Sequence, residues 1–327
     1  MPTTRAQEPS SLLRGDEIPR LSVVLPVYDE AETIRELIPE IVETLSQLGP
    51  TFEIVAVDDG STDETPAILR QLIRRYPGQL RVAQHLRNRG NGASLRTAIR
   101  LAQGEIVVCM DADGQHSPAD IAQLADLIPP YDLVIGARKL GYRGSWKRGA
   151  ANRFFNVFAT WLSRTPIEDL TSGFRAMRRS VALHFLPLFP AGFSAPTTTT
   201  LAFLKAGYSV AFVPIHVRQR AAGRSKIRLW EDGTRFVTII LRMAMLYDPL
   251  RIFLPVGVVL ALLGIAAEAA GLINAQRLVL ANSAVFFFTA ALLTWLLGLI
   301  SDQVSSTRVQ YHGDESIAIL GENDPAA

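Results

Sequence analysis

Two acidic side chains follow an apolar run in the middle of the chain. Asp111 and Asp113 come directly after residues 106–110, and Gln115 stands two residues farther on. Alternate residues at a strand end point the same way, so both carboxylates can face one ligand. Such carboxylates repel each other unless a cation lies between them, and hard oxygen ligands suit Mg²⁺ or Mn²⁺ bridging to phosphates. Asp111, Asp113 and Gln115 are candidate metal ligands, although a lone Asp-x-Asp is also common on surfaces.

Two further polar clusters follow earlier apolar runs. Pro26, Tyr28 and Glu30 come after residues 21–25, and the pair Asp58 and Asp59 comes after residues 53–57. Ligands of open α/β sheets collect at the carboxyl ends of the strands, so these clusters are expected at the same site as Asp111. The Gly-Ser-Thr-Asp that follows Asp59 is also typical of a turn and helix cap, and both interpretations can hold together.

The segment 138–179 is strongly basic. Its basic residues far outnumber its two acids, Glu168 and Asp169, so an anion is expected to bind there. Arginine suits phosphate because its planar fork matches phosphate oxygens. The basic residues are Arg138, Lys139, Arg143, Lys147, Arg148, Arg153, Arg164, Arg175, Arg178 and Arg179.

The apolar pattern predicts the elements that position these residues. Short β-branched runs, too apolar for strands with one wet face, alternate with amphipathic stretches of helical period. This alternation is typical of a doubly wound α/β domain with a mostly parallel sheet. The expected strands are 21–25, 53–57, 80–83 and 106–110, and the expected helices are 32–48, 64–75 and 92–101.

Two long apolar stretches near the end of the sequence predict a transmembrane hairpin. Residues 250–273 and 278–300 each exceed the roughly 20 residues that cross ~30 Å of hydrocarbon. Arginines gather before the first stretch, so the positive-inside rule puts both flanks in the cytoplasm. Glu268 lies inside the first span. A carboxylate there is expected to serve the function of the protein, to hold the two helices together or to reach the membrane interface.

The stretch before the hairpin, residues 230–249, has apolar side chains on one side and Arg235 and Arg242 with acids on the other. This pattern is typical of a helix that lies in the membrane interface. A helix packed on the globular domain is the alternative interpretation.

Composition narrows the class of protein. The formal net charge is only +2, which argues against a nucleic-acid binder that relies on overall charge. The single cysteine, Cys109, lies in an apolar run, so we expect a buried thiol and a reducing compartment. The first residues contain no apolar signal-peptide core, so the first domain is expected in the cytoplasm.

Six motifs in order resemble a known family. They are similar to the motifs of the family 2 glycosyltransferases with the GT-A fold, over residues 21 to about 230. The last two resemble the branch of dolichol-phosphate mannose synthase and bacterial polyprenyl-phosphate glycosyltransferases. The motifs are Pro26-Val-Tyr-Asp-Glu30, Val57-Asp-Asp-Gly-Ser-Thr-Asp63, Asn88-Arg-Gly-Asn-Gly-Ala-Ser94, Asp111-Ala-Asp-Gly-Gln-His116, Thr171-Ser-Gly-Phe-Arg175 and Gly223-Arg-Ser-Lys226.

The resemblance implies a reaction and its partners. It implies inverting transfer of a sugar from a UDP- or GDP-linked donor to a polyprenyl phosphate, such as undecaprenyl phosphate, at the cytoplasmic side of a bacterial inner membrane. Mg²⁺ or Mn²⁺ would be the cofactor, and a homo-oligomer is left open. A glycan or glycolipid acceptor and a non-catalytic nucleotide-sugar-binding membrane protein are the alternatives.

The resemblance also implies roles for single residues. Arg148 and Arg224 have a second interpretation, as anchors for lipid headgroups. The nucleotide-sugar would contact Pro26, Tyr28, Glu30, Asp58, Asp59 and Asp111, and the metal would contact Asp111, Asp113 and Gln115. The acceptor phosphate would contact Arg138, Arg148, Arg224 and Lys226, and the catalytic set would be Asp113, Arg148, Arg175, Arg224 and Lys226, with Ser172 helping Arg175 to close the site.

Two positions and the domain bounds complete the expectations. The run 197–200 of four threonines departs from the family pattern and puts small hydroxyls where larger side chains would shape the acceptor or sugar pocket. His116 is expected to be a solvated loop histidine, with phosphate contact as the alternative. The expected parts are a leader (1–20), the GT-A catalytic domain (21–229), the interfacial helix (230–249), the transmembrane hairpin (250–300) and a cytoplasmic tail (301–327).

Overall fold

The computed structural model describes residues 19–49, 51–138, 146–190, 195–218, 242, 244–245, 247–275 and 281–308. The chain divides into two compact units, Met1–Leu204 with Tyr208–Met243 and Lys205–Gly207 with Ala244–Ala327. Most of the leader, all of the stretch 219–241 and the last 19 residues of the expected tail lie outside the described residues.

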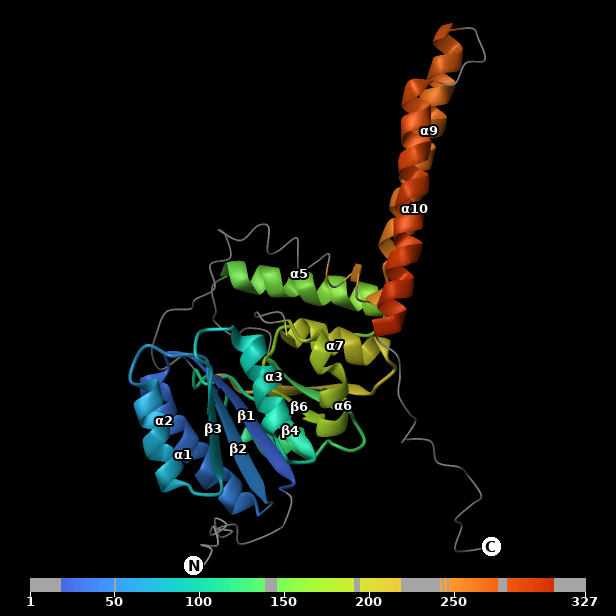
Figure 1. Cartoon of the computed structure of the whole chain (residues 1–327). Helices are drawn as coiled ribbons and strands as arrows, with labels where there is room; N and C mark the ends of the chain where they lie inside the picture. The colour runs from blue at the N-terminus through green and yellow to red at the C-terminus, as the bar shows by residue number, and fades with distance from the viewer. Residues whose placement is uncertain are drawn as a thin grey trace, which may run out of the picture. The chain divides into compact units, whose positions relative to one another are not determined.

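A seven-stranded sheet forms the centre of the first unit, in the order β3-β2-β1-β4-β6-β5-β7 (Figure 1). Only β6 runs antiparallel to its neighbours, so the predicted mostly parallel sheet is confirmed. The strands are β1 Leu21–Val27, β2 Phe52–Asp58, β3 Leu80–Gln84, β4 Ile106–Cys109, β5 Leu133–Arg138, β6 Arg175–Arg178 and β7 Val210–Ile215.

Helices cover the sheet, with α1 and α2 on one side of β1–β3 and α3 on the other (Figure 1). All expected strands and helices up to residue 110 are present, with ends shifted by at most two residues at any end. The helices are α1 Ala31–Leu48, α2 Thr65–Arg75, α3 Asn91–Leu101, α4 Asp120–Ala125, α5 Trp146–Ser163, α6 Arg179–Phe185 and α7 Ala195–Lys205, with a short 3₁₀ turn at Leu186–Leu188.

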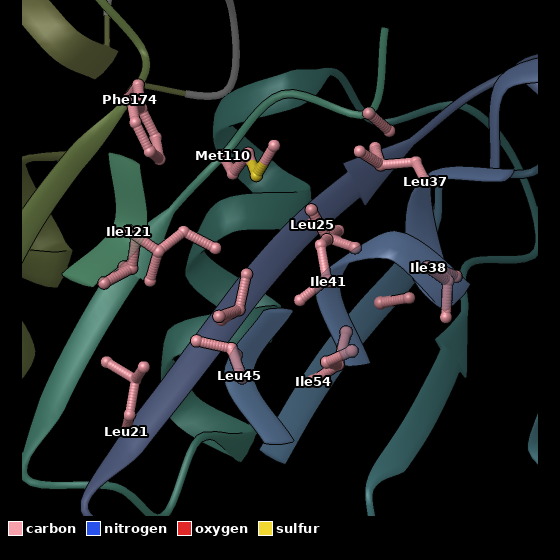
Figure 2. Close-up of a cluster of buried hydrophobic side chains, with 14 of the residues drawn as sticks. Leu21, Leu25, Leu37, Ile38, Ile41, Leu45, Ile54, Met110, Ile121 and Phe174 are labelled. Carbon is pink, nitrogen blue, oxygen red and sulfur yellow. The ribbon is translucent and has the colours of Figure 1, made fainter. Parts of the chain in front are cut away.

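The core lies between α1 and the central strands (Figure 2). Every residue of β1 is buried, because β1 has a parallel neighbour on each side and helices above and below. Ile38, Ile41 and Leu45 form a stripe at helical spacing on α1 and belong to the same buried cluster as Leu25 of β1. This packing fixes where the carboxyl end of β1 lies, and with it the loop that follows.

The second unit contains α9 Leu250–Ala275 and α10 Asn282–Arg308, both long and apolar enough to cross a membrane. They pack together through a seven-residue repeat of glycines. Gly257 faces Trp295, Gly264 faces Phe288 and Gly271 faces Ala281; a β-carbon at Gly264 would lie 2.9 Å from the Phe288 ring. A seven-residue repeat keeps one seam of each helix on its partner, and glycine leaves room there for the aromatic rings.

The helix that contains the second apolar stretch, 278–300, differs from that stretch at both ends. The helix begins at Asn282 instead of residue 278, and Glu268 accepts a hydrogen bond from the Ala281 backbone N–H (3.0 Å) just before it. Glu268 therefore satisfies a backbone donor at the start of its partner helix. At the other end the helix runs to Arg308, because helix propagation needs backbone hydrogen bonds and not apolar side chains.

Candidate active site

Three loops meet at one edge of the sheet because β2, β1 and β4 are parallel neighbours. Val27 of β1 pairs in register with Asp58 of β2, and the Met110 N–H donates to Val24 of β1 just before Asp111. The predicted polar clusters therefore lie at the same edge, as their positions after the strands predict. Pro26 lies inside β1 and is buried, while Tyr28 and Glu30 are half-buried in the loop beyond it.

Asp58 is buried and organises two neighbouring segments. One carboxylate oxygen accepts the Ser61 backbone N–H (2.9 Å) and the other accepts the Gln84 side-chain amide (2.9 Å). The Ser61 hydroxyl in turn accepts the backbone N–H of Asp29 (2.9 Å). The loop after β1 is thus tied to the loop after β2, and the turn interpretation of this motif is confirmed.

Asp59 is also buried and holds the start of α3. Its carboxylate accepts the Gly90 N–H (2.7 Å) and the Arg89 N–H (3.0 Å), and it contacts Nδ1 of His85 at 2.6 Å. The His85 Nε2 lies 2.9 Å from the Thr97 hydroxyl. Sequence reasoning missed His85, whose only signal is its position directly after the third strand.

Asp111 lies in a crowded part of the site. The Asn91 amide lies 3.4 Å from Asp111 Oδ1, at hydrogen-bond distance, and a β-carbon at Gly173 would come within 2.5 Å of Oδ2. Position 173 therefore accepts only glycine if the carboxylate is to stay where it is. The motif that contains Gly173 lies far along the chain, yet it forms one wall of the site around Asp111.

His116 ends the motif 111–116 and contacts the motif 171–175. The expectation that it is a solvated loop histidine is wrong. The side chain is buried and stacks on Phe174, with ring centroids 4.9 Å apart. Burial lowers the pKa of His116 to about 4, so the ring is neutral at physiological pH. The apolar ring of Phe174, which the pattern 171–175 places beside it, supplies the packing that removes His116 from water.

The segment 216–218 runs along the loop that follows Asp113. His116 forms an isolated antiparallel bridge with Val217, and the Arg218 N–H donates to the Gln115 carbonyl (2.8 Å). The Arg218 guanidinium also donates to both carboxylate oxygens of Glu40, at 2.7 and 2.9 Å. Arg218 therefore lies directly beside Gln115, a candidate metal ligand.

The donor chemistry of this loop fits a divalent ion. Asp111, Asp113 and Gln115 are half-buried and supply two carboxylates and an amide, all hard oxygen donors. Asp113 accepts the Gln115 backbone N–H (3.1 Å), which fixes the turn between them. Among the described residues no group of three or more His, Cys, Asp or Glu side chains is arranged to hold a metal ion by itself. Such an open donor set suits Mg²⁺ or Mn²⁺ that is also bound by phosphates and water.

Arg138 lies at the end of β5 and is held by Asp169. Its Nε and Nη2 donate to the two carboxylate oxygens of Asp169, at 2.7 and 2.9 Å, and Nη2 also donates to the Thr171 hydroxyl at 2.6 Å. Burial raises the pKa of Asp169, but the hydrogen bonds and charge of Arg138 outweigh it and hold that pKa below its ordinary value. Asp169, which belongs to the same basic segment 138–179, thus offsets the positive charge of Arg138.

Arg175 is the first residue of β6, and its buried side chain reaches α7. Its guanidinium donates to the carbonyls of Ser172 and Pro196 and lies 3.3 Å from the Thr200 hydroxyl. Burial lowers its pKa to about 10, so the group keeps its charge. The residues 197–200 are buried in α7, and Thr200 contacts Arg175 instead of lining an open pocket.

Several predicted site residues lie outside what the structure describes. Arg224 and Lys226 fall in the stretch 219–241, and for Arg148 only the backbone, in α5, is described. The roles predicted for them stay predictions. Cys109 is buried as expected, and burial raises the pKa of its thiol to about 12.

Comparison with known proteins gives two family matches. Residues 22–185 match the model of glycosyl transferase family 2, and residues 248–307 match the GtrB C-terminal hairpin. These matches cover the sheet with its loops and the two apolar helices, respectively.

Two curated relatives are 30% and 31% identical to this chain over the aligned residues. Undecaprenyl-phosphate 4-deoxy-4-formamido-L-arabinose transferase of Edwardsiella ictaluri (strain 93-146) is 30% identical over 256 residues, which cover 75% of this chain and 74% of that protein. Polyprenol monophosphomannose synthase of Mycolicibacterium smegmatis (strain ATCC 700084 / mc(2)155) is 31% identical over 218 residues, 64% of this chain and 81% of that protein.

Among solved structures, glucosyl-3-phosphoglycerate synthase from Mycobacterium tuberculosis in complex with Mn²⁺, uridine-diphosphate and phosphoglyceric acid has a TM-score of 0.55 at 23% identity. The match covers 69% of this chain and 78% of that one. At this identity the likeness concerns the fold alone.

Proposed function

Because this chain belongs to glycosyltransferase family 2, we propose that it transfers a sugar from a nucleotide-sugar to the phosphate of a polyprenyl lipid. Its fold is the GT-A fold that the motifs predicted. The observation that carries the proposal is that one chain joins the Asp111 loop to an apolar helix hairpin. An enzyme whose sugar acceptor is dissolved in the bilayer needs both a site for the nucleotide-sugar and an attachment to the membrane. The relatives named for undecaprenyl-phosphate and polyprenol substrates support the same acceptor.

The donor would bind at the carboxyl edge of β1, β2 and β4. Tyr28, Glu30 and Asp111 would contact the nucleoside and the first phosphate, with carboxylates accepting from base or ribose hydroxyl donors. Asp58 and Asp59 already accept hydrogen bonds from Ser61, Gln84 and the 88–90 loop, so their part in donor binding would be chiefly to shape those loops.

Asp111, Asp113 and Gln115 would hold Mg²⁺ or Mn²⁺ against the donor diphosphate. When bound, that ion would stabilise the negative charge of the leaving nucleoside diphosphate. The protein itself keeps these oxygen ligands in place. The contacts of Gly173 and Asn91 with Asp111 and the turn at Asp113 support that role.

The acceptor phosphate is its own nucleophile. A phosphate monoester is anionic at neutral pH, so its oxygen can form the new bond to the anomeric carbon without a general base. The bond from that carbon to the diphosphate oxygen breaks on the opposite face, which inverts the sugar centre. The protein then has to position the lipid phosphate and offset its charge, and Arg148, Arg224 and Lys226 are the proposed groups.

We place the catalytic unit on the cytoplasmic side of a bacterial inner membrane, where nucleotide-sugars are made. The donor would be a UDP- or GDP-linked sugar. Assembly into a homo-oligomer is compatible with two exposed membrane helices.

The test uses the full chain in membranes with undecaprenyl phosphate and a panel of radiolabelled UDP- and GDP-sugars. Labelled lipid should form with at least one donor, should need Mg²⁺ or Mn²⁺, and should be lost in Asp113→Ala with the unfolding temperature unchanged. Label in a glycan instead of the lipid fraction would identify a different acceptor. Donor binding without turnover at any lipid phosphate concentration would identify a non-catalytic protein.

A further inference from the structure

His85 is a buried histidine that directly follows β3. Its backbone N–H donates to the Asp58 carbonyl (2.8 Å), so the pairing with β2 continues one residue beyond β3 and places the ring beside Asp59. Both ring nitrogens meet a partner. Nδ1 lies 2.6 Å from the Asp59 carboxylate, and Nε2 lies 2.9 Å from the Thr97 hydroxyl of α3. An ionised carboxylate only accepts hydrogen bonds, so Nδ1 is the donor of its pair.

The two partners of His85 both lead to α3. Asp59 accepts the backbone N–H groups of Arg89 and Gly90 just before the helix, and Thr97 lies within it. Gly90 has a φ of 92°, a conformation that favours glycine and turns the chain into α3. The attachment points at Gly90 and Thr97 are roughly 10 Å apart along the helix at 1.5 Å per residue. Two attachments on one helix fix both its position and its rotation.

The helix that is held in this way brings Asn91 to the candidate metal site. Asn91 is the first residue of α3, and its side-chain amide lies 3.4 Å from Asp111 Oδ1. A donor on a metal-binding carboxylate fixes the direction of that carboxylate, and it contributes to metal affinity without contacting the metal. The orientation of Asp111 therefore depends on where α3 starts.

Filling space in the core does not account for a histidine at position 85. A buried polar ring costs free energy unless its nitrogens are hydrogen-bonded, and an apolar side chain would occupy the same space without that cost. The imidazole adds a hydrogen bond in each of two directions, one to the loop after β2 and one to α3.

We propose that His85 is a positioning residue for the metal end of the candidate site. Through Asp59 and the start of α3, it keeps the Asn91 amide against Asp111. His85 contacts neither the metal nor a substrate in this role. The inference rests on the divalent ion of the proposed function, but not on the identity of the sugar or of the acceptor.

The test measures Mn²⁺ binding to the full chain in detergent, once with UDP and once with GDP. The electron paramagnetic resonance signal of free Mn²⁺ falls as the ion binds, so the measurement needs neither turnover nor lipid acceptor. Because a residue that orients a metal ligand contributes about 10-fold or more to metal affinity, Asn91→Ala should weaken binding by about 10-fold. His85→Leu acts from farther away and should weaken binding by about 5-fold.

Two polar variants separate the two contacts of the ring. The amide nitrogen of His85→Asn lies near the position of Nδ1 and can still donate to Asp59, whereas the longer amide of His85→Gln lies near Nε2 and Thr97. His85→Asn should therefore keep most of the Mn²⁺ affinity, and His85→Gln should lose as much as His85→Leu. Equal losses in the two variants, or full affinity in both, would overturn the proposal. This comparison decides the matter even if His85→Leu does not fold.

A double variant tests the route from His85 to the metal. His85→Leu should add little to the loss in Asn91→Ala, because the amide that His85 positions is then already gone. Losses that multiply in full would mean a separate route and would contradict the proposal.

Ser22→Ala is the matched control for the loss of a buried polar contact. Ser22 is buried near the amino end of β1, away from the carboxyl edge where the candidate site lies, and its hydroxyl donates to Glu53 (2.7 Å). Ser22→Ala should lower the unfolding temperature and leave Mn²⁺ affinity unchanged. A loss of Mn²⁺ affinity in Ser22→Ala as large as in His85→Leu would show that general destabilisation explains both.

Sugar transfer is measured separately from Mn²⁺ binding. If the wild-type chain binds Mn²⁺ with either nucleotide but makes no polyprenyl-linked sugar, the proposed function fails while the comparison of His85 variants still stands. A wild-type chain that binds Mn²⁺ with neither nucleotide would overturn both.

Discussion

Gly173 lies against the carboxylate of Asp111, so close that a β-carbon at position 173 would come within 2.5 Å of Oδ2. The two residues are far apart in the sequence and belong to different motifs. Their contact makes the motif 171–175 part of the candidate metal site, and it gives that glycine a role that its sequence context does not reveal.

Gly173→Ala should therefore lower kcat/KM at least tenfold, because a shift of the Asp111 carboxylate by about 1 Å can cost ~10²-fold in rate. The unfolding temperature should fall only slightly. Gly49→Ala is the matched control: Gly49 has a φ of 86° with open space around it, so alanine there should lower stability and leave kcat/KM unchanged. Full activity in Gly173→Ala would show that Asp111 need not stay in place.

Arg224→Ala should raise the KM for the lipid acceptor more than the KM for the nucleotide-sugar. The reason is that a guanidinium beside the acceptor phosphate contributes to binding that phosphate and not the donor. Steady-state kinetics in nanodiscs with each substrate varied in turn would measure both constants. An equal rise in the two would contradict the assignment and favour a role in headgroup anchoring.

Asp59→Asn should destabilise the catalytic unit by about 2–4 kcal/mol, because the new amide group would face buried N–H donors of Gly90 or His85 that lose their acceptor. Asp63→Asn is the control. Asp63 is exposed and accepts N–H groups of Thr65 and Ala31, so its loss should cost less than about 1 kcal/mol. Thermal unfolding in detergent would compare the two, and equal shifts would argue against the bracing role of Asp59.

Asp169→Asn should lower the unfolding temperature at pH 7, and the gap to wild type should narrow as the pH falls. Because Arg138 holds the folded pKa of Asp169 below its ordinary value of 3.8, the pair stabilises the fold above that pH. This stability is lost as the pH falls through the folded pKa. Unfolding temperatures at pH 7 and at a series of pH values below 3.8 would test the trend, and a gap that stays constant through that acidic series would show that the charge of Asp169 does not stabilise the fold.

Much of the fold follows from local pattern. The buried runs at β1, β2 and β4 and the helical stripe on α1 predict strands and helices close to their observed bounds, because burial and periodicity are properties of neighbouring residues. The helix of the second apolar stretch continues eight residues beyond residue 300, where the sequence is mostly polar and gives no apolar pattern to predict it.

The sequence by itself determined that acids follow the strands, that a basic segment and an apolar hairpin come later, and that these belong to one family of transferases. Only the tertiary structure decided which of those charged groups bind other residues of the protein instead of a ligand. Asp59 braces His85, Arg138 pairs with Asp169 and Arg175 is buried beside Thr200, each with a partner 25 or more residues away. A pattern of residue types records which groups are charged, but the packing of distant segments decides which partner each charge meets and how much water reaches it.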